Sequence, residues 1–334
     1  MRIPSPSLHG LTRDRARLVN SVLVVVLLVV ALAPVGLSAY VQTVATQTAI
    51  LAMLGLGWNV IGSARLLSFG QAAFFGAGAY TAAIILSDTG ISGWLTLPIA
   101  AISGAVLAVI VIPCFRVAGL YFSIMTLALA SALGIIGNSV LPGGQNGLYY
   151  RSLFGTDTRE AYLAVLAGLL IVLAAVIAVR RSSVGLGIVL INADEEAARS
   201  IGVNVFATKS IAWIIAGACG GLAGGLYTAS ALVITPDTVF NVSYSILPVL
   251  IVTLGGLGTL YGPLLGAAIY ALINNWISSG TSNGSVTLII YGGALALLAT
   301  LLPYGLVGAL LGRARPQRVL AERSIDPEQV ETPS

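Results

Sequence analysis

Long runs of apolar residues without a single charged side chain constrain this chain more than any other feature. Residues 18–40, 94–114 and 161–179 are three such runs, and about 20 apolar residues suffice to cross the hydrocarbon core of a bilayer. Apolar types make up 57% of the 334 residues and charged types 8%, whereas a soluble domain carries about 25% charged residues. Because backbone in lipid must satisfy its own hydrogen bonds, such runs fold as helices. The sequence predicts an all-α polytopic membrane protein.

We expect about ten membrane segments, some of them broken or half-length helices. In chain order they cover residues 18–40, 44–61, 66–86, 94–114, 119–140, 161–179, 209–233, 246–257, 264–277 and 286–311. Residues 18–311 then form the transmembrane domain, between an N-terminal tail (1–17) and a C-terminal tail (312–334). A cleaved signal peptide is an alternative for residues 18–40, but the run is long for a signal core.

Arginine and lysine at the ends of the spans predict the orientation. With the N-terminus inside, five basic residues between spans fall on the cytoplasmic side, as the positive-inside rule requires; they are Arg65, Arg116, Arg180, Arg181 and Lys209. Both termini are then cytoplasmic, and the loop 141–160 lies outside. The net charge of +4 therefore reflects topology, and we expect no nucleic-acid partner.

Glycine interrupts two of the predicted segments. Residues 66–86 mix glycine with polar Ser68 and Gln71, a composition that belongs in a protein interior rather than against lipid. Near the C-terminus the helix is broken by a cluster that consists of Gly255, Gly256, Gly258, Gly262 and Pro263. Interrupted hydrophobic segments often mark a transport pathway. Residues 67–80 and 257–270 also resemble each other, which leaves an internal repeat open.

Neutral polar side chains at membrane depth are the candidates for lining a translocation path. They are Asn59, Ser68, Gln71, Tyr121, Ser123 and Thr126. The alternative role for each is hydrogen bonding between helices. No acidic or basic residue lies in the middle of a span, which disfavours a proton-coupled carrier. A small neutral or zwitterionic solute suits such a lining.

A short polar segment, residues 192–202, interrupts the membrane-like sequence and predicts a cytoplasmic helix. Asn192 or Asp194 can cap its start, and Gly202 offers a left-handed stop. Glu195 and Arg199 are spaced to pair on one face. The neighbouring residues Glu196, Ala197 and Ala198 complete the segment, whose two alanines leave a second face smooth enough to dock against another protein. The alternative is a solvated helix that only joins two spans.

Catalytic motifs are missing from the chain. It contains no phosphate-binding loop of the G-x-x-x-x-G-K-[ST] type, no serine or cysteine nucleophile with a partner histidine, and a single histidine, His9. Cys114 and Cys219 each lie in apolar sequence, where inert buried thiols are expected. We therefore expect no enzyme activity, no metal site and no cofactor of its own, so that energy must come from a partner or transport is passive.

Six motifs together resemble those of the permeases of branched-chain amino-acid ABC importers, in particular the LivM-like branch. The resemblance covers nearly the whole chain, and its motifs lie at residues 66–82, 143–148, 195–205, 223–227, 254–263 and 303–308. Each is weak alone, but the six occur in the order found in the family.

The resemblance implies a heteromeric importer in the bacterial cytoplasmic (inner) membrane. This chain would form half of the translocation path for branched-chain or related small neutral amino acids, beside a second homologous permease subunit. An extracytoplasmic substrate-binding protein would deliver the solute. Two cytoplasmic ATPase subunits would bind ATP and Mg²⁺ and drive transport. Within a cytoplasmic coupling loop, residues 182–209, the contact with the ATPase would fall on Asp194, Glu195, Glu196, Ala197, Ala198, Arg199 and Gly202.

Departures from the family pattern leave alternatives open. Residues 186–191 are apolar where the family often has a basic run, Leu120 stands where an aspartate is usual, and Gln71 where histidine is frequent. A urea or amide permease, or a sugar or nucleoside permease of the same superfamily, therefore remains an alternative. So does a stand-alone channel or carrier, in which the acidic helix only shapes a vestibule.

Overall fold

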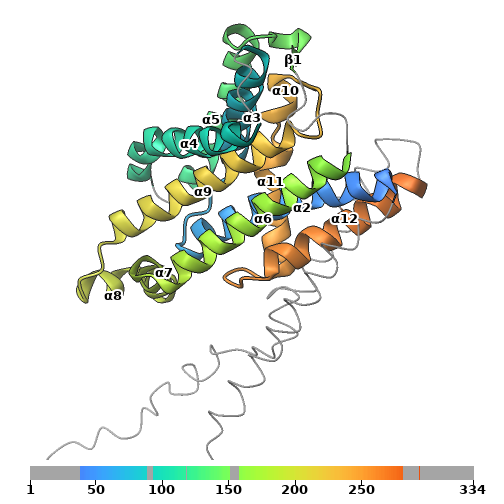
Figure 1. Ribbon diagram of the computed structural model, residues 1–334. Coiled ribbons are helices and arrows are strands. Elements are labelled where there is room, and N and C mark those ends of the chain that lie inside the picture. The colour runs from blue at the N-terminus through green and yellow to red at the C-terminus, as the bar shows by residue number, and fades with distance from the viewer. Residues whose placement is uncertain (1–37, 89–92, 118, 151–157, 281–292, 294–334) are drawn as a thin grey trace, which may run out of the picture.

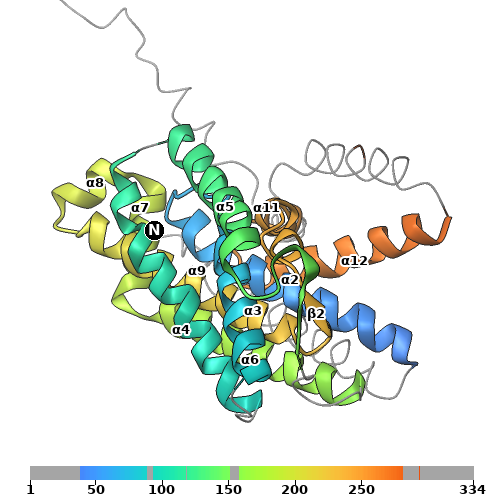
Figure 2. The ribbon, with the colours of Figure 1, turned by 90° about the horizontal axis from the view of Figure 1, so that it is seen from above.

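The computed structural model describes residues 38–88, 93–117, 119–150, 158–280 and 293, and these residues are almost wholly helical (Figures 1 and 2). Apart from residues 38–40 and Gly293, the predicted first span (18–40) and last span (286–311) lie outside the described residues. Both predicted tails lie outside them as well.

The described part of the chain forms helices joined mostly by short connections. In order they are α2 (Ala39–Ser63), α3 (Gln71–Asp88), α4 (Gly93–Val111), η2 (Ile112–Arg116), α5 (Leu120–Val140), η3 (Gly144–Asn146), α6 (Thr158–Arg181), α7 (Ser183–Ala193), α8 (Glu195–Ser200), α9 (Val205–Tyr227), α10 (Pro236–Val239), α11 (Ser243–Gly255) and α12 (Gly262–Gly280). Two short strands, β1 (Leu148–Tyr149) and β2 (Val233–Ile234), pair antiparallel with Leu148 opposite Ile234.

Six stretches of helix are long and apolar enough to cross a membrane. They are Ala39–Ser63, Gly93–Phe115, Leu120–Val140, Thr158–Arg181, Val205–Tyr227 and Pro236–Gly255. Two shorter apolar helices, Gln71–Ser87 and Ser183–Ala193, accompany them. The prediction of a helical polytopic membrane protein is therefore confirmed. The count of ten segments and the cytoplasmic placement of the termini stay predictions.

Helix α9 lies at the centre and packs against α2, α3 and α4. Glycine makes this close approach possible: a Cβ added at Gly78 of α3 would collide with the carbonyl of Gly221 in α9, and one at Gly104 of α4 would collide with that of Gly217. Small residues are the usual means of packing membrane helices, because lipid gives apolar side chains no reason to leave it. In the core, the backbones of α3 and α4 therefore lie in direct contact with the backbone of α9.

The predicted segment 66–86 is helical only from Gln71 onward, and the preceding residues form an extended loop. Trp58 and Ser123 fix this loop by donating hydrogen bonds to the carbonyls of Ser68 (2.7 Å) and Leu67 (2.5 Å). Ser68 and Gln71 are 1% and 0% exposed. The expectation that this segment belongs in the interior is therefore confirmed, although it is not one continuous helix.

The predicted break after Gly255 turns the chain back on itself. Gly256 and Gly258 have φ angles of +117° and +76°, which non-glycine residues rarely adopt. An added Cβ at Gly255 would strike Gly262, and one at Gly266 would strike Ile251, so α11 and α12 run antiparallel in close contact. The predicted break is confirmed, and a helix follows it as α12. The sequence did not indicate that two positive-φ glycines reverse the direction of the chain at this point.

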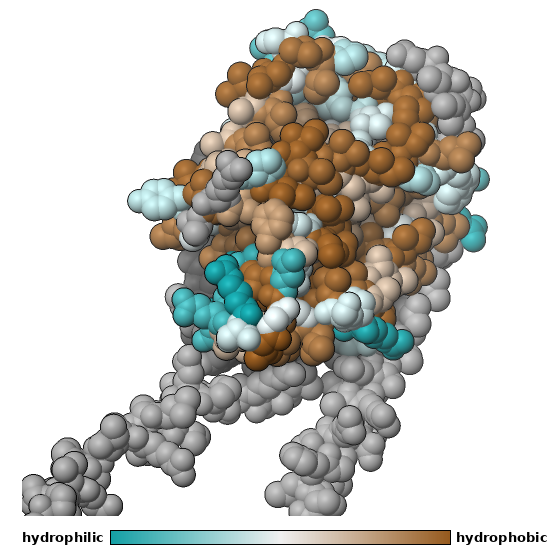
Figure 3. Space-filling model, turned by 90° about the vertical axis from the view of Figure 1, so that its left-hand side faces the viewer, coloured by the Kyte–Doolittle hydropathy of each residue, from teal (hydrophilic) through white to brown (hydrophobic). Residues whose placement is uncertain are grey.

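The molecule has two distinct ends, separated by the length of α9. Its 23 residues span roughly 34 Å at 1.5 Å per residue. Helix α8 precedes α9 directly, while β2 and α10 follow it, so these elements lie at opposite ends (Figure 1). Figure 3 shows a broad apolar band on the face with α8 at its lower edge, and strongly polar residues gather along that edge.

Candidate functional site

Asp194 forms the junction between the two helices of the candidate coupling segment, residues 182–209. It ends α7, and its side chain accepts hydrogen bonds from the backbone N–H groups of Glu196 (2.8 Å) and Ala197 (3.0 Å) at the start of α8. These two hydrogen bonds stabilise the carboxylate form and hold the pKa of Asp194 below its usual range. Of the two predicted caps, the structure selects Asp194, because Asn192 lies inside α7.

Gly202 ends α8 as predicted, with a φ of +89°. The N–H of Val203 donates to the carbonyl of Ala198 and the N–H of Gly202 to that of Arg199, both at 3.0 Å. This pair of bonds is the Schellman arrangement, which satisfies carbonyls that a helix end would otherwise leave free. Helix α8 is only six residues long, and it is closed at both ends by its own local sequence.

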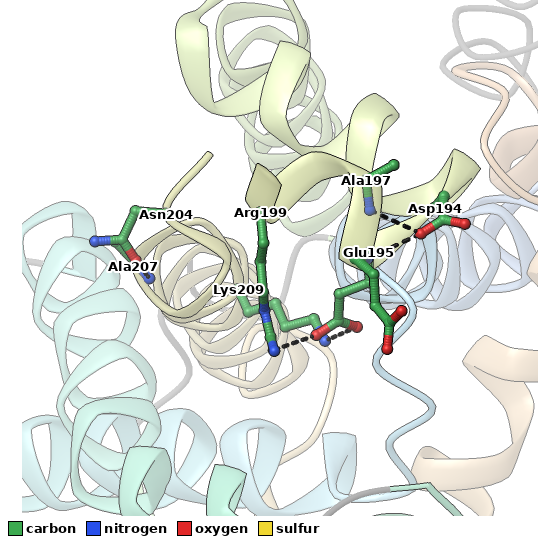
Figure 4. Close-up of polar contacts among 8 residues, drawn as sticks. Asp194, Glu195, Ala197, Arg199, Asn204, Ala207 and Lys209 are labelled. Atoms are coloured by element: carbon green, nitrogen blue, oxygen red, sulfur yellow. Dashed lines mark hydrogen bonds and ion pairs between the residues drawn. The ribbon is translucent and has the colours of Figure 1, made fainter. Parts of the chain in front are cut away.

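Glu195 is the charged centre of the segment (Figure 4). One carboxylate oxygen pairs with Arg199 at 2.9 Å, as the spacing predicted, and the other pairs with Lys209 of α9 at 2.7 Å. Burial raises the pKa of Glu195, but the hydrogen bonds and charges of Lys209 and Arg199 outweigh that effect, so its pKa lies below the usual range. The ion pair with Lys209 anchors α8 to the first turns of α9.

The two alanines of α8 face opposite ways. Ala198 is 2% exposed and packs with Ile191 of α7 and Val205 of α9, whereas Ala197 is exposed. Glu196 is exposed beside Ala197. The two alanines therefore do not form one docking face as predicted. Ala198 packs α8 against α7 and α9 of the same chain, whereas Glu196 and Ala197 form the outward surface.

Exposed apolar side chains flank α8 on both sides. Ile201 is 68% exposed and Phe206 60% exposed, and Leu186 and Val189 of α7 are exposed as well. The apolar run 186–191, which departs from the family pattern, is thus part of the helix α7. The segment offers a polar ridge with apolar side chains beside it, a composition that suits a protein interface.

Arg65 connects this segment to the membrane helices. It lies in the loop between α2 and α3 and donates a hydrogen bond to the carbonyl of Ala193, the last residue of α7, at 3.2 Å. Its φ of +58° is in the left-handed region, where a side chain costs energy. The sequence had marked Arg65 only as a sign of topology, and nothing local revealed its partner, which is 128 residues away.

The predicted path residues divide into two groups. Five of them are buried, at 4% exposure or less: Asn59, Ser68, Gln71, Ser123 and Thr126. The side chains of all but Ser68 form hydrogen bonds with backbone groups of neighbouring segments; for example, Gln71 donates to the carbonyl of Ala216 in α9 at 3.2 Å. The hydroxyl of Ser68 accepts from the N–H of Gly70 in its own loop. Tyr121, by contrast, is 76% exposed at the start of α5. These contacts fit helix–helix bonding, and a role in the path stays a prediction.

Asn59 holds the glycine break in place. Its amide nitrogen donates to the carbonyl of Thr259 at 2.6 Å, and its amide oxygen accepts from the N–H of Gly258 at 2.8 Å. The buried side chain of Asn59 in α2 thus forms hydrogen bonds with one carbonyl and one N–H group of the turn between α11 and α12. Pro263 follows as the second residue of α12. The predicted break and a predicted path residue form one structural unit, which the sequence did not indicate.

These features define a class: a polytopic helical membrane protein with a polar, internally fixed helical segment at one end of the bundle. Among known families, the one described as branched-chain amino acid transport system / permease component matches residues 40–301. The chain belongs to this family of transport permeases, and the predicted resemblance is confirmed.

Individual relatives agree with this assignment. The chain is 30% identical to the high-affinity branched-chain amino acid transport system permease protein LivM of Escherichia coli strain K12, over 95% of this chain and 80% of the relative. The LivM protein of Salmonella typhimurium is 29% identical with the same coverage. A probable branched-chain amino acid transport permease protein LivH of Methanocaldococcus jannaschii is 25% identical over 78% of this chain and 88% of its own length. No solved structure matches the chain.

Proposed function

We propose that this chain is one half of the translocation path of an ATP-driven importer for branched-chain or related small neutral amino acids, in the cytoplasmic membrane of a bacterium. The proposal rests on the local geometry of α8. This helix is capped by Asp194, ends at Gly202 and is linked to α9 by the ion pair between Glu195 and Lys209. A helix of six residues has no stability of its own, so this degree of fixation favours a docking element over a plain connection.

Partners in this proposal are a second homologous permease subunit, two cytoplasmic ATPase subunits and an extracytoplasmic substrate-binding protein. ATP and Mg²⁺ would be bound by the ATPase subunits. The positive-inside rule supports the orientation, because Arg65, Arg181 and Lys209 all lie at the end that carries α8. The ATPase contact would fall on the outward residues Glu196 and Ala197, with Ile201 as an apolar neighbour.

The internal fixation suggests how motion at α8 would reach the membrane. Lys209 fastens α8 to α9, the central helix, and Arg65 fastens the end of α7 to the loop before α3. A displacement of α8 by an ATPase would therefore pull on two membrane helices at once. Asp194, Glu195, Ala198 and Gly202 hold the segment in shape, and Glu196 and Ala197 meet the partner.

Copurification tests the proposal. The chain is expressed with candidate ATPase subunits from the same genomic neighbourhood, and the native chain is compared with a Glu196→Lys variant, which reverses an outward charge without touching the ion pairs of Glu195. We expect the native chain to retain an ATPase and the variant to release most of it. Glu160→Gln, at the opposite end of the bundle, is the matched control. If the native chain retains no ATPase but moves solute alone after reconstitution, the stand-alone carrier replaces this proposal.

A further inference from the structure

Helix α7 is apolar on every side, although only one side of it is buried. The buried side consists of Gly185, Gly187, Ile188 and Ile191. On the opposite side Leu186 and Val189, three residues apart, are 62% and 65% exposed. A helix that is apolar all round is normally covered by a protein core or by lipid. The exposed side of α7 has no such cover among the described residues.

The position of α7 along the bundle follows from the helix before it. Helix α6 has 24 residues, which span roughly 36 Å at 1.5 Å per residue, enough to cross a hydrocarbon core of about 30 Å. Its last two residues, Arg180 and Arg181, are exposed, and arginine at the end of a span reaches the lipid headgroups. Only Ser182 separates these residues from α7, which therefore begins at the membrane surface.

Close packing keeps α7 at that level. A Cβ added at Gly185 would collide with the carbonyl oxygen of Val179 in α6, and one at Gly187 would lie 3.1 Å from the side chain of Thr208. Thr208 belongs to the first turn of α9. Helix α7 thus lies against the ends of two membrane helices, and Figure 1 shows it at the end of α6 beside α8.

The sequences of α7 and α8 fit different surroundings. Residues 182–193 contain no charged side chain, whereas three of the six residues of α8 are charged. Asp194, with an extended backbone, separates the two helices. Because interfaces between proteins carry a polar rim, the charge-free helix is matched best by lipid tails, and the charged helix by water or a protein. The change at Asp194 therefore indicates where the chain leaves the membrane.

We propose that α7 is an interfacial helix that inserts Leu186 and Val189 among the lipid tails, while Arg180 and Arg181 bind the phosphate groups of anionic phospholipids. By the positive-inside rule this is the cytoplasmic leaflet, whose anionic lipids attract basic residues. Interfacial helices lie with their apolar face about 5–10 Å deep. The leaflet then holds the start of the coupling segment, and α8 extends from it into water. This inference requires neither an ATPase nor an amino-acid substrate.

Quenching by nitroxide-labelled phospholipids tests the insertion. The full-length chain carries an environment-sensitive fluorophore at Leu186→Cys and is reconstituted into nanodiscs, with and without ATPase subunits. Controls are Ile171→Cys, exposed in the middle of α6, and Ala197→Cys, exposed on α8; the unsubstituted chain gives the background from Cys114 and Cys219. We expect the Leu186 label to be quenched most by a nitroxide near the headgroup, and the Ile171 label by one deep in the tail. The Ala197 label should respond only to aqueous iodide.

A second comparison tests the two arginines. Nitroxide-labelled phosphatidylglycerol, which is anionic, and nitroxide-labelled phosphatidylcholine, which has no net charge, are added separately to phosphatidylcholine nanodiscs. We expect half-maximal quenching of the Leu186 label at an about fivefold lower fraction of the anionic lipid. The double variant Arg180→Gln, Arg181→Gln should require equal fractions of the two lipids. Arg159→Gln, at the other end of α6, should keep the preference.

Three results would overturn the inference. One is a Leu186 label that iodide quenches and lipids do not. Another is a label that becomes shielded from iodide only when the ATPase is added, which would make α7 a second protein contact. The third is an equal response to the two lipids with both arginines present. Val189→Cys repeats each measurement, so that a folding defect of Leu186→Cys does not decide the outcome. Copurification of the ATPase is measured separately, so a failure here leaves the proposed function standing.

Discussion

The centre of the helix bundle and the segment at its end are stabilised in opposite ways. Around α9, backbones touch through glycine, and a single added carbon at Gly78 or Gly104 has no space. In α7 and α8, polar bonds of Asp194 and Glu195 define the shape, and only a small apolar cluster around Ala198 lies beneath them. The contrast teaches that the bundle is held by dense packing, while the segment keeps its shape through polar bonds without being deeply buried, as the proposed contact with a partner requires.

Overpacking the centre should have the largest effect on stability. In Gly78→Ala the new Cβ meets the carbonyl of Gly221, so α3 and α9 must separate or the backbone must shift, at a cost of about 1–3 kcal/mol. We expect a lower midpoint of thermal unfolding in detergent and less protein in the membrane. The control is Ala128→Val, which adds more volume at an exposed position of α5. Equal behaviour of the two variants would contradict the glycine-contact account.

Removing the polar support of the break should cost a similar or slightly smaller amount. Asn59→Leu leaves the carbonyl of Thr259 and the N–H of Gly258 without their partner, which costs about 1–3 kcal/mol when the groups stay buried. The control is Thr253→Val, because the hydroxyl of Thr253 is exposed and bonds only within its own helix. Thermal unfolding and solute uptake are both measured. An Asn59→Leu protein of native stability but reduced uptake would instead favour the role in the translocation path.

At the segment, function should change more than stability. Lys209→Met removes the ion pair between Glu195 and α9; the side chain of Lys209 is 16% exposed. Arg199→Met removes the second ion pair of Glu195; the side chain of Arg199 is 63% exposed. The exposed pair with Arg199 contributes about 0–1 kcal/mol, and in Lys209→Met the half-buried Glu195 keeps Arg199 as its partner, so both variants should unfold close to the native temperature. We expect Lys209→Met to lower uptake per ATP hydrolysed, because α8 is then loose on α9, and Arg199→Met to do so less. Equal loss in the two variants would argue against the anchor.

The smallest effect concerns pH. The pKa of Asp194 lies below its usual range in the folded protein, so its capping bonds contribute fully above the ordinary carboxyl pKa of about 4 and are lost only as pH falls through the lower folded value. Hydrogen exchange at the amides of Glu196 and Ala197, corrected for intrinsic rates, should therefore show constant protection from pH 8 to 5. Asp194→Ala should reduce that protection throughout the range. Protection that declines between pH 7 and 5 in the native chain would contradict this cap.

The contrast between the segment and the helix bundle also explains which features the sequence predicted. The pair of Glu195 with Arg199 and the stop at Gly202 are local signals, and both were predicted correctly. The cap is local as well, but the sequence offered Asn192 and Asp194, and only the structure selects Asp194. The partners Lys209 and Arg65 were missed, because they lie outside the local pattern and meet the segment only in the fold.

Long-range geometry also limited the prediction for the membrane helices. Their apolar runs predicted spans, but neither composition nor periodicity reveals that Asn59 of α2 binds the turn beyond α11. For the same reason Tyr121 and Ser123, two residues apart, were assigned one role, although the first is 76% and the second 4% exposed.

The central claim is that α8 presents its outward face to an ATPase, and adjacent cysteines test it most directly. Ala197→Cys places a thiol on the exposed face, and Ala198→Cys places one on the face that is 2% exposed and packed on this chain. Membranes that contain the full transporter are treated with a bifunctional thiol reagent, and the unsubstituted chain provides the background from Cys114 and Cys219. We predict an adduct with the ATPase subunit for Ala197→Cys and none above background for Ala198→Cys. Equal labelling at both positions, or an adduct at neither, would contradict the claim.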